Sequence, residues 1–149
     1  AKNTMVLCLY GRIQAEQLMN YEEAKSYFQQ ALAINIHALE VYPHYLQTLI
    51  LNEDYKEAKK LIDFALTIKG INKAEILFKK AILFEVQFEF KKALKVIKKA
   101  KLHSIQYKYE SDIEDVEKRI KTKVDLVEKK KKKITKSEKS KKSSKKKSK

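Results

Sequence analysis

The side chains best suited to catalysis or metal binding are few in this sequence and stand far apart. They are three histidines, His37, His44 and His103, and one cysteine, Cys8. A zinc site needs several such ligands at short, regular spacings, which these four residues do not have. The sequence also contains no HExxH motif and no glycine-rich phosphate loop. We therefore expect a protein that is not an enzyme and that uses no metal and no cofactor.

Cys8 lies in an apolar run and is expected to pack in a core. A single cysteine cannot form an internal disulfide, which favours a reducing intracellular compartment such as the cytoplasm. No apolar run approaches the roughly 18 residues that a membrane-spanning helix requires. The sequence therefore predicts no membrane span.

Lysine is abundant, and it is concentrated at the C-terminal end. Residues 129–149 contain 13 lysines and one acid, Glu138, whereas the other 128 residues carry 21 basic and 18 acidic side chains. A segment of this composition cannot bury apolar surface, and its charges repel one another. We expect a disordered basic tail at 129–149, following a folded domain at 1–128.

The tail has several candidate roles. Its lysines could neutralise nucleic-acid phosphates or anionic lipid head groups, or act as a nuclear-import signal in a eukaryote. It contains no arginine and no aromatic residue, so nucleic-acid binding by the tail alone should be non-specific and sensitive to salt. A solubilising tail with no dedicated ligand is an equal alternative.

The elements that carry these residues are expected to be helices. Only two glycines and one proline, Pro43, occur in the chain, and a sheet protein would need many more turn residues. Helices are predicted near residues 4–18, 21–35, 39–52, 55–69, 73–87, 90–102 and 106–131.

A pattern of about 34 residues recurs three times. Residues 20–25, 54–59 and 89–94 each read polar, aromatic, charged, charged, alanine and a long side chain. In each copy a second alanine follows seven residues after the first, with a bulky apolar residue between them, which places all three on one helical face. These triplets are Ala24, Phe28 and Ala31; Ala58, Ile62 and Ala65; and Ala93, Ile97 and Ala100. The small residues let two helices approach closely, and the bulky one fills the space between them.

This pattern resembles the tetratricopeptide repeat, a 34-residue helix–turn–helix unit, in three copies over about residues 5–103. The second helices match well. In the first helices the family's Leu-Gly pair is suggested by Tyr10 and Gly11, one residue out of register. The closing proline is replaced by Ile36, Gly70 and Ile105. The resemblance implies an all-α, right-handed superhelical stack of antiparallel helical hairpins.

After the last repeat, apolar residues recur every three or four positions and predict an amphipathic helix. They are Tyr109, Ile113, Val116, Ile120, Val124 and Val127. The interpretation that we favour is a capping helix at 106–128, which covers the end of the stack and leaves a monomer. The alternative is a coiled-coil seam over Tyr109–Val127 that joins two chains into an oligomer.

The resemblance places a binding groove on the first helices, where family members hold a peptide or a partner's helix. The groove positions in this sequence are Leu9, Tyr10, Ile13, Gln17, His44, Gln47, Leu51, Phe78, Lys79 and Ile82. One subclass of the family clamps a terminal carboxylate with lysine and asparagine. Of its matching positions here only Lys79 has a suitable side chain, so such a clamp is not expected.

Two functions from different classes follow. The first is a protein-interaction scaffold whose groove binds a peptide or helix of a partner. Apolar residues in the groove could instead pack against neighbouring helices, including further repeats upstream if the chain is part of a longer protein. The second is a nucleic-acid-associated or ribosome-associated protein that binds phosphates through its lysine-rich tail.

Overall fold

The computed structural model describes residues 3–104 and 107–145, and within these ranges it contains seven α-helices and no strand. The helices are α1 (Thr4–Glu16), α2 (Tyr21–Ile34), α3 (Val41–Leu51), α4 (Tyr55–Ala65), α5 (Lys73–Val86), α6 (Phe90–His103) and α7 (Tyr107–Lys145). The predicted all-α class is confirmed, and every predicted helix is present. Ile105, expected in place of a closing proline, lies outside the described residues.

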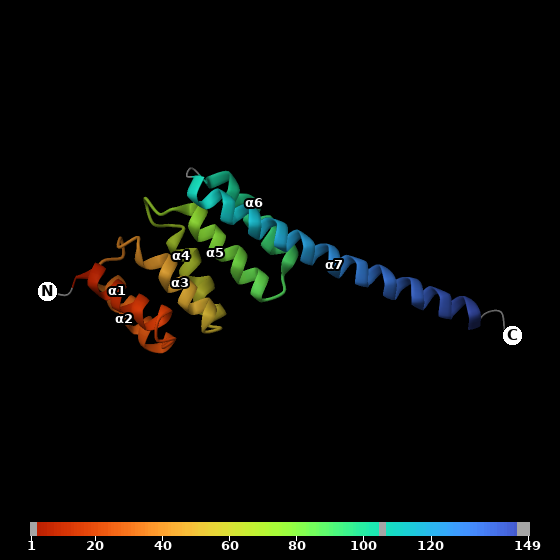
Figure 1. Cartoon of the computed structure of the whole chain (residues 1–149), viewed down its shortest axis with the longest axis horizontal. Coiled ribbons are helices and arrows are strands. Elements are labelled where there is room, and N and C mark those ends of the chain that lie inside the picture. The colour runs from red at the N-terminus through yellow and green to blue at the C-terminus, as the bar shows by residue number, and fades with distance from the viewer. Residues whose placement is uncertain (1–2, 105–106, 146–149) are drawn as a thin grey trace.

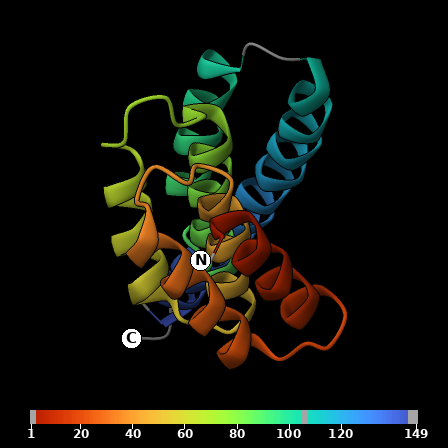
Figure 2. The ribbon, with the colours of Figure 1, turned by 90° about the vertical axis from the view of Figure 1, so that its left-hand side faces the viewer.

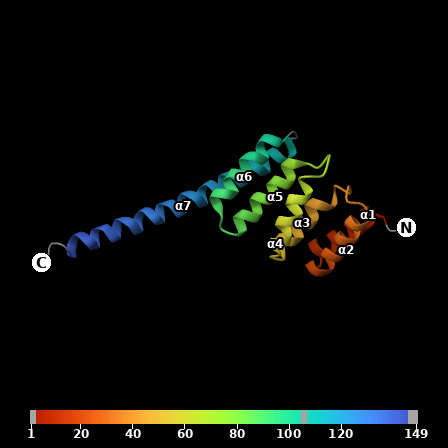
Figure 3. The same ribbon diagram turned by 180° about the vertical axis from the view of Figure 1, so that it is seen from behind.

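The helices pack in chain order (Figure 1). Helices α1 and α2, α3 and α4, and α5 and α6 form three hairpins, and α3 and α5 each also contact the hairpin before them. Viewed from the side of the N-terminus, the first hairpin stands in front of the others (Figure 2). Helix α7 packs on α5 and α6 and then extends well beyond the stack, as both Figure 1 and the view from behind in Figure 3 show.

The three hairpins repeat one another in structure. Ala24, Ala58 and Ala93 are each the fourth residue of a second helix, and all three are buried. Two residues before each of these helices stands a non-glycine residue with a positive φ: Met19 at 51°, Glu53 at 59° and Phe88 at 62°. The turns of the second and third hairpins also share a hydrogen bond, from Asp54 N to Leu49 O and from Glu89 N to Phe84 O, while the turn of the first hairpin is one residue longer. The sequence repeat is therefore also a repeat of structure.

The core follows the small–bulky–small pattern of the sequence. The bulky members Phe28, Ile62 and Ile97 are fully buried, as are the alanines on either side of them. One core cluster runs from α1 into α5, and a second joins α5, α6 and α7. Leu66 and Ile82 pack against both clusters, so the core is continuous along the stack.

Gly11 lets the helices of the first hairpin approach closely. It is buried in α1, and a Cβ added to it would lie 2.6 Å from Cε1 of Phe28 in α2. The Phe28 ring is enclosed by core and cannot swing aside. The absence of a side chain at residue 11 is therefore what makes room for the aromatic ring.

We expect Gly11→Ala to have opposite effects in two backgrounds. In the natural chain the Cβ–ring overlap should outweigh the gain of about 1 kcal/mol in helix propensity and leave a net loss of about 1 kcal/mol. With Phe28→Ala already present the overlap is gone, so the same change should stabilise by about 1 kcal/mol. Urea unfolding of the four proteins measures both effects, and a loss of equal size in both backgrounds would refute the contact.

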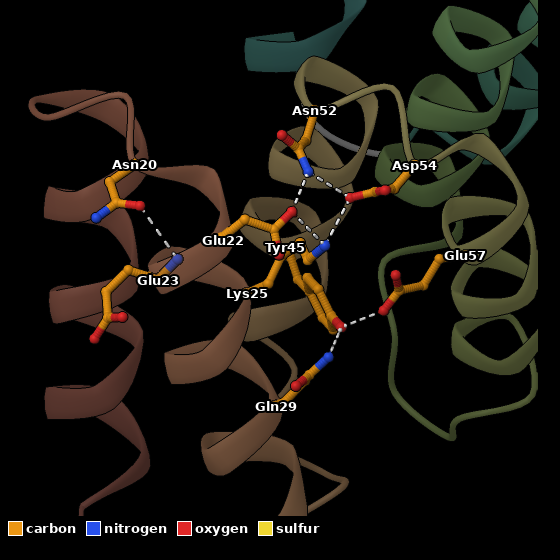
Figure 4. A network of polar contacts seen from close by, with 9 residues as sticks. All are labelled: Asn20, Glu22, Glu23, Lys25, Gln29, Tyr45, Asn52, Asp54 and Glu57. Atoms are coloured by element: carbon orange, nitrogen blue, oxygen red, sulfur yellow. Dashed lines mark hydrogen bonds and ion pairs between the residues drawn. The ribbon is translucent and has the colours of Figure 1, made fainter.

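A polar network joins the first two hairpins (Figure 4). Lys25 of α2 lies 3.0 Å from Glu22 and 2.8 Å from Asp54, while the Asn52 amide donates to the same two carboxylates. The hydrogen bond from Lys25 lowers the pKa of Asp54. Asn20 and Asp54 are the N-terminal capping residues of α2 and α4. Asn20 does accept a bond from the backbone of Glu23, but Asp54 makes no capping bond, because its carboxylate binds Lys25 and Asn52 instead.

Below this network Tyr45 links the same elements. Its hydroxyl accepts a hydrogen bond from Gln29 of α2 and donates one to Glu57 of α4 at 2.9 Å (Figure 4). Burial raises the pKa of Tyr45 to about 12. The tyrosine therefore stays protonated and can keep donating.

Helix α7 packs part of its apolar stripe on the last hairpin. Ile113, Val116 and Ile120 of α7 are buried against α5 and α6, and Val124 packs at the edge of the same cluster. These side chains are therefore not free to form a seam with another chain, which leaves Val127 as the exposed member of the stripe. The side chain of Tyr109 lies outside the described part of the chain.

The predicted disorder from residue 129 differs from the structure, in which α7 continues as a helix to Lys145. Lysine is a good helix former, and no glycine or proline follows residue 70. The packed first half of α7 also supplies the nucleus that an isolated lysine-rich peptide would have to form for itself. None of the described helices is long and apolar enough to cross a membrane.

Candidate partner-binding surface

The first helices of the three hairpins present one continuous surface. His44 Nδ1 of α3 lies 3.7 Å from Glu16 Oε1 of α1. Further along α3, Gln47 Oε1 accepts a 2.7 Å hydrogen bond from Lys79 Nζ of α5. These two contacts bring the same face of each first helix together, and we call the surface that they join the groove face.

Apolar side chains flank this polar line. Leu9, Ile13 and Leu51 are about half exposed, and the first two share a face of α1 with Glu16. Phe78 and Ile82 of α5 are partly buried against the core. The groove face therefore offers exposed apolar groups on α1 and α3 beside a polar line that reaches α5.

Two of the predicted groove residues lie less centrally than the others. The ring of Tyr10 packs on Tyr27 of α2 with 5.7 Å between the ring centres, so it contacts its own hairpin. Gln17 is the C-terminal capping residue of α1 and is exposed there. The remaining eight positions lie on α1, α3 and α5.

Lys79 is the cation at the centre of the groove face. Burial lowers its pKa, which the carboxylate of Glu75 partly opposes. Beside it is a hollow of about 160 Å³ between α5 and the start of α7, lined by Ala74, Glu75, Phe78, Lys79, Asp112 and Ile113. A partly desolvated ammonium at the edge of such a hollow suits a carbonyl or carboxylate of a bound chain.

His44 lies in a more crowded setting. Burial lowers its pKa, and the nearby Arg12 guanidinium adds to the effect, while Glu16 opposes it. Arg12 itself binds Glu16 at 3.3 Å. At neutral pH His44 is therefore uncharged and contributes a polar edge rather than a positive charge.

Sequence reasoning missed the extent of the apolar surface on α1. Met5 and Val6 are exposed beside Leu9 and Ile13, opposite the buried face that carries Leu7. The sequence contained the relevant signal, which is the apolar residues on more than one face of the segment that forms α1. A helix that is apolar on all sides is typical of a buried helix, so each such face is expected to need a covering neighbour. In this structure one of the two apolar faces of α1 has no neighbour among the described residues.

The residue types that could bind a metal ion do not gather in the described part of the chain, and Cys8 is buried. No group of three histidine, cysteine or acidic side chains gathers there in a way that could hold a metal ion. Cys8 is buried as predicted, with Sγ 4.0 Å from the carbonyl oxygen of Glu40, and burial raises its pKa. A buried thiol that resists ionisation is a poor nucleophile.

Comparison with known proteins finds no protein-family model that matches this chain and no curated protein with significant similarity to it. The interpretation of the surface therefore depends on its geometry.

Proposed function

We propose that the chain is a protein-interaction scaffold of the tetratricopeptide-repeat kind, whose groove face binds an amphipathic peptide or helix of a partner protein. The observation that carries the proposal is the pair of contacts Glu16–His44 and Gln47–Lys79, which join the same faces of three successive first helices. The equivalent positions of Ala24, Ala58 and Ala93, and of the residue with a positive φ before each second helix, support the repeat assignment.

The chemistry of the groove face suits an amphipathic segment. Leu9 and Ile13 offer apolar contacts at one end, and the hollow beside Phe78 offers another at the opposite end. Between them Lys79 and Gln47 can exchange their mutual hydrogen bond for bonds to a partner. Helix-in-groove recognition uses this combination of apolar anchors and a few polar contacts.

The test is a substitution on α1 that leaves the core intact. Tyr10 and Ile82 are unsuitable targets because they pack within the domain. We expect Leu9→Gln with Ile13→Gln to weaken binding at least tenfold, since each removes an apolar anchor while glutamine preserves helix propensity. The probes are helical peptides selected from a displayed random library on the natural chain, and their affinity is measured by fluorescence anisotropy.

Leu102→Gln is the matched control, because Leu102 is an 86% exposed leucine on the second helix of the last hairpin. It should leave peptide affinity unchanged. Amide chemical-shift changes on peptide binding should cluster on α1, α3 and α5. Selected peptides that bind the α1 variant as tightly as the natural chain would reject the groove assignment.

A further inference from the structure

A second surface forms where the turn between α5 and α6 meets the middle of α7. An open hollow of about 270 Å³ lies there. The residues that line it include Phe88, Phe90, Lys91, Val124, Val127 and Lys131. We call this surface the aromatic pad; its residues belong to the turn between α5 and α6, the start of α6 and the middle of α7.

Phe88 is the most unusual residue of the pad. It is 81% exposed, and its φ of 62° is one that bulky side chains rarely adopt. Its ring meets Phe90 edge to face with 5.8 Å between the ring centres, and it does not belong to the core. An exposed aromatic ring adds little to folding, so it is a candidate for contact with a ligand.

The pad continues directly into the lysine-rich part of α7. Val124, Val127 and Lys131 follow one another on a single helical face, at spacings of three and four residues. Lysines occupy all five positions from 129 to 133 and are exposed there. Since five consecutive residues cover the whole circumference of a helix, positive charge surrounds α7 where it leaves the stack.

The acids beside the pad are held only by exposed ion pairs. Glu128 lies 3.0 Å from Lys91, and Glu89 pairs with Lys92. Exposed pairs of this kind are weak and are readily exchanged. A phosphate could therefore replace either glutamate as the partner of its lysine.

We propose that the aromatic pad and the adjoining lysine-rich helix bind single-stranded nucleic acid, with a base stacked on the exposed ring of Phe88, which Phe90 contacts edge to face, and phosphates on the lysines. Single-strand binders combine a basic track with aromatic rings on which bases stack, and both parts meet here. A duplex keeps its bases stacked on one another and offers no free base face. Residues 129–149 contain no aromatic residue. The fold nevertheless places Phe88 and Phe90 beside the part of α7 from which this segment continues.

An anionic membrane fits the same surface less well. A helix that lies in a membrane interface needs one apolar face along its length. From residue 129 to residue 139, α7 carries seven lysines and one large apolar residue, Ile134. The charge therefore surrounds the helix instead of leaving one face apolar, and a flexible polyanion with bases matches it better.

The experiment measures binding of the whole chain to a labelled oligothymidylate of about 16 nucleotides by anisotropy, at about 100 mM salt. Phe88→Ala should weaken binding about tenfold, the loss of roughly one base stack. Phe88→Trp should restore it. The control is Met19→Ala, at the equivalent turn position of the first hairpin, where Met19 is 73% exposed with a φ of 51°. This change should leave binding unaffected.

Two further probes isolate the role of the bases. An abasic strand of equal length, with the same charge, should bind the natural chain at least tenfold more weakly than the oligothymidylate, and Phe88→Ala should not weaken it further. Equal binding of the two strands, or no effect of Phe88→Ala, overturns the proposal. Tight binding to phosphatidylserine vesicles or to polyglutamate that depends on Phe88, without such dependence for the oligothymidylate, also overturns it.

Discussion

Replacing Phe28 with alanine is expected to lower the free energy of unfolding by about 3–5 kcal/mol. The Phe28 ring has no solvent exposure, and it fills the space beside Gly11 of α1 while packing against Tyr45 of α3 with 5.6 Å between the ring centres. Its loss therefore opens a cavity at the junction of three helices. Because a domain of this size has only about 5–15 kcal/mol of net stability, the variant should unfold at a much lower urea concentration.

Phe88→Ala is the matched control for this prediction. It is the same chemical change in a side chain that is 81% exposed, and it should alter stability by no more than about 0.5 kcal/mol. The two variants are compared by urea unfolding followed by circular dichroism. Equal losses in the two proteins would show that the repeated bulky residues do not hold the hairpins together.

The fold was accessible from sequence because its signal is local. The spacing of Ala24, Phe28 and Ala31, and its recurrence around Ala58 and Ala93, specifies which helical face is buried. The stripe that includes Ile113 and Ile120 specifies the same for the start of α7. Each of these patterns lies within one helix, so none of them depends on knowing which helices pack together.

The end of α7 was not accessible in the same way. The composition of residues 129–149 excludes burial, but burial is not required for a helix that continues from a packed one. Lysines with no glycine or proline among them keep helical backbone angles while their charges repel one another. Composition alone could not decide between these opposing effects.

The candidate sites, like the fold, could be predicted only in part from the sequence. The groove positions Leu9, His44 and Lys79 could be named from the repeat, because equivalent residues of successive repeats share a face. The contacts between these helices could not be predicted from the sequence, since Lys79 and Gln47 are 32 residues apart and either could form a hydrogen bond with another residue. The aromatic pad was missed for a similar reason, because Phe88 and Val127 line one hollow only through the packing of α7 on the last hairpin.

A buried carboxylate, Glu85, holds α7 on the last hairpin. Arg119 donates a hydrogen bond to each carboxylate oxygen, from Nε to Oε1 at 2.8 Å and from Nη2 to Oε2 at 2.7 Å. Lys123 also donates to Oε1. The hydrogen bonds from Arg119 lower the pKa of Glu85. Both cations lie on α7 with half-exposed side chains, whereas the carboxylate is almost completely enclosed.

Because the carboxylate is buried and its two cations are exposed, replacing both cations should lower the free energy of unfolding more than replacing the cations and Glu85 together. Arg119→Met with Lys123→Met leaves a buried carboxylate without a cation, which should cost about 3 kcal/mol. That is the lower end of the usual range, because solvent already screens the two exposed cations. Adding Glu85→Leu removes the stranded charge and should return the protein to within about 1 kcal/mol of the natural chain. Urea unfolding of the three proteins tests the order.

The pH dependence gives an independent check. In the natural chain the folded pKa of Glu85 is lowered, so its contribution is complete above the ordinary glutamate value of 4.5 and is lost as the pH falls through the lowered value. In the double variant burial without a cation should raise the same pKa, so folding improves as the carboxyl group takes up a proton. The stability difference between the two proteins should therefore shrink as the pH falls below neutrality. A difference that is independent of pH would show that lost side-chain packing, and not the enclosed charge of Glu85, accounts for the effect.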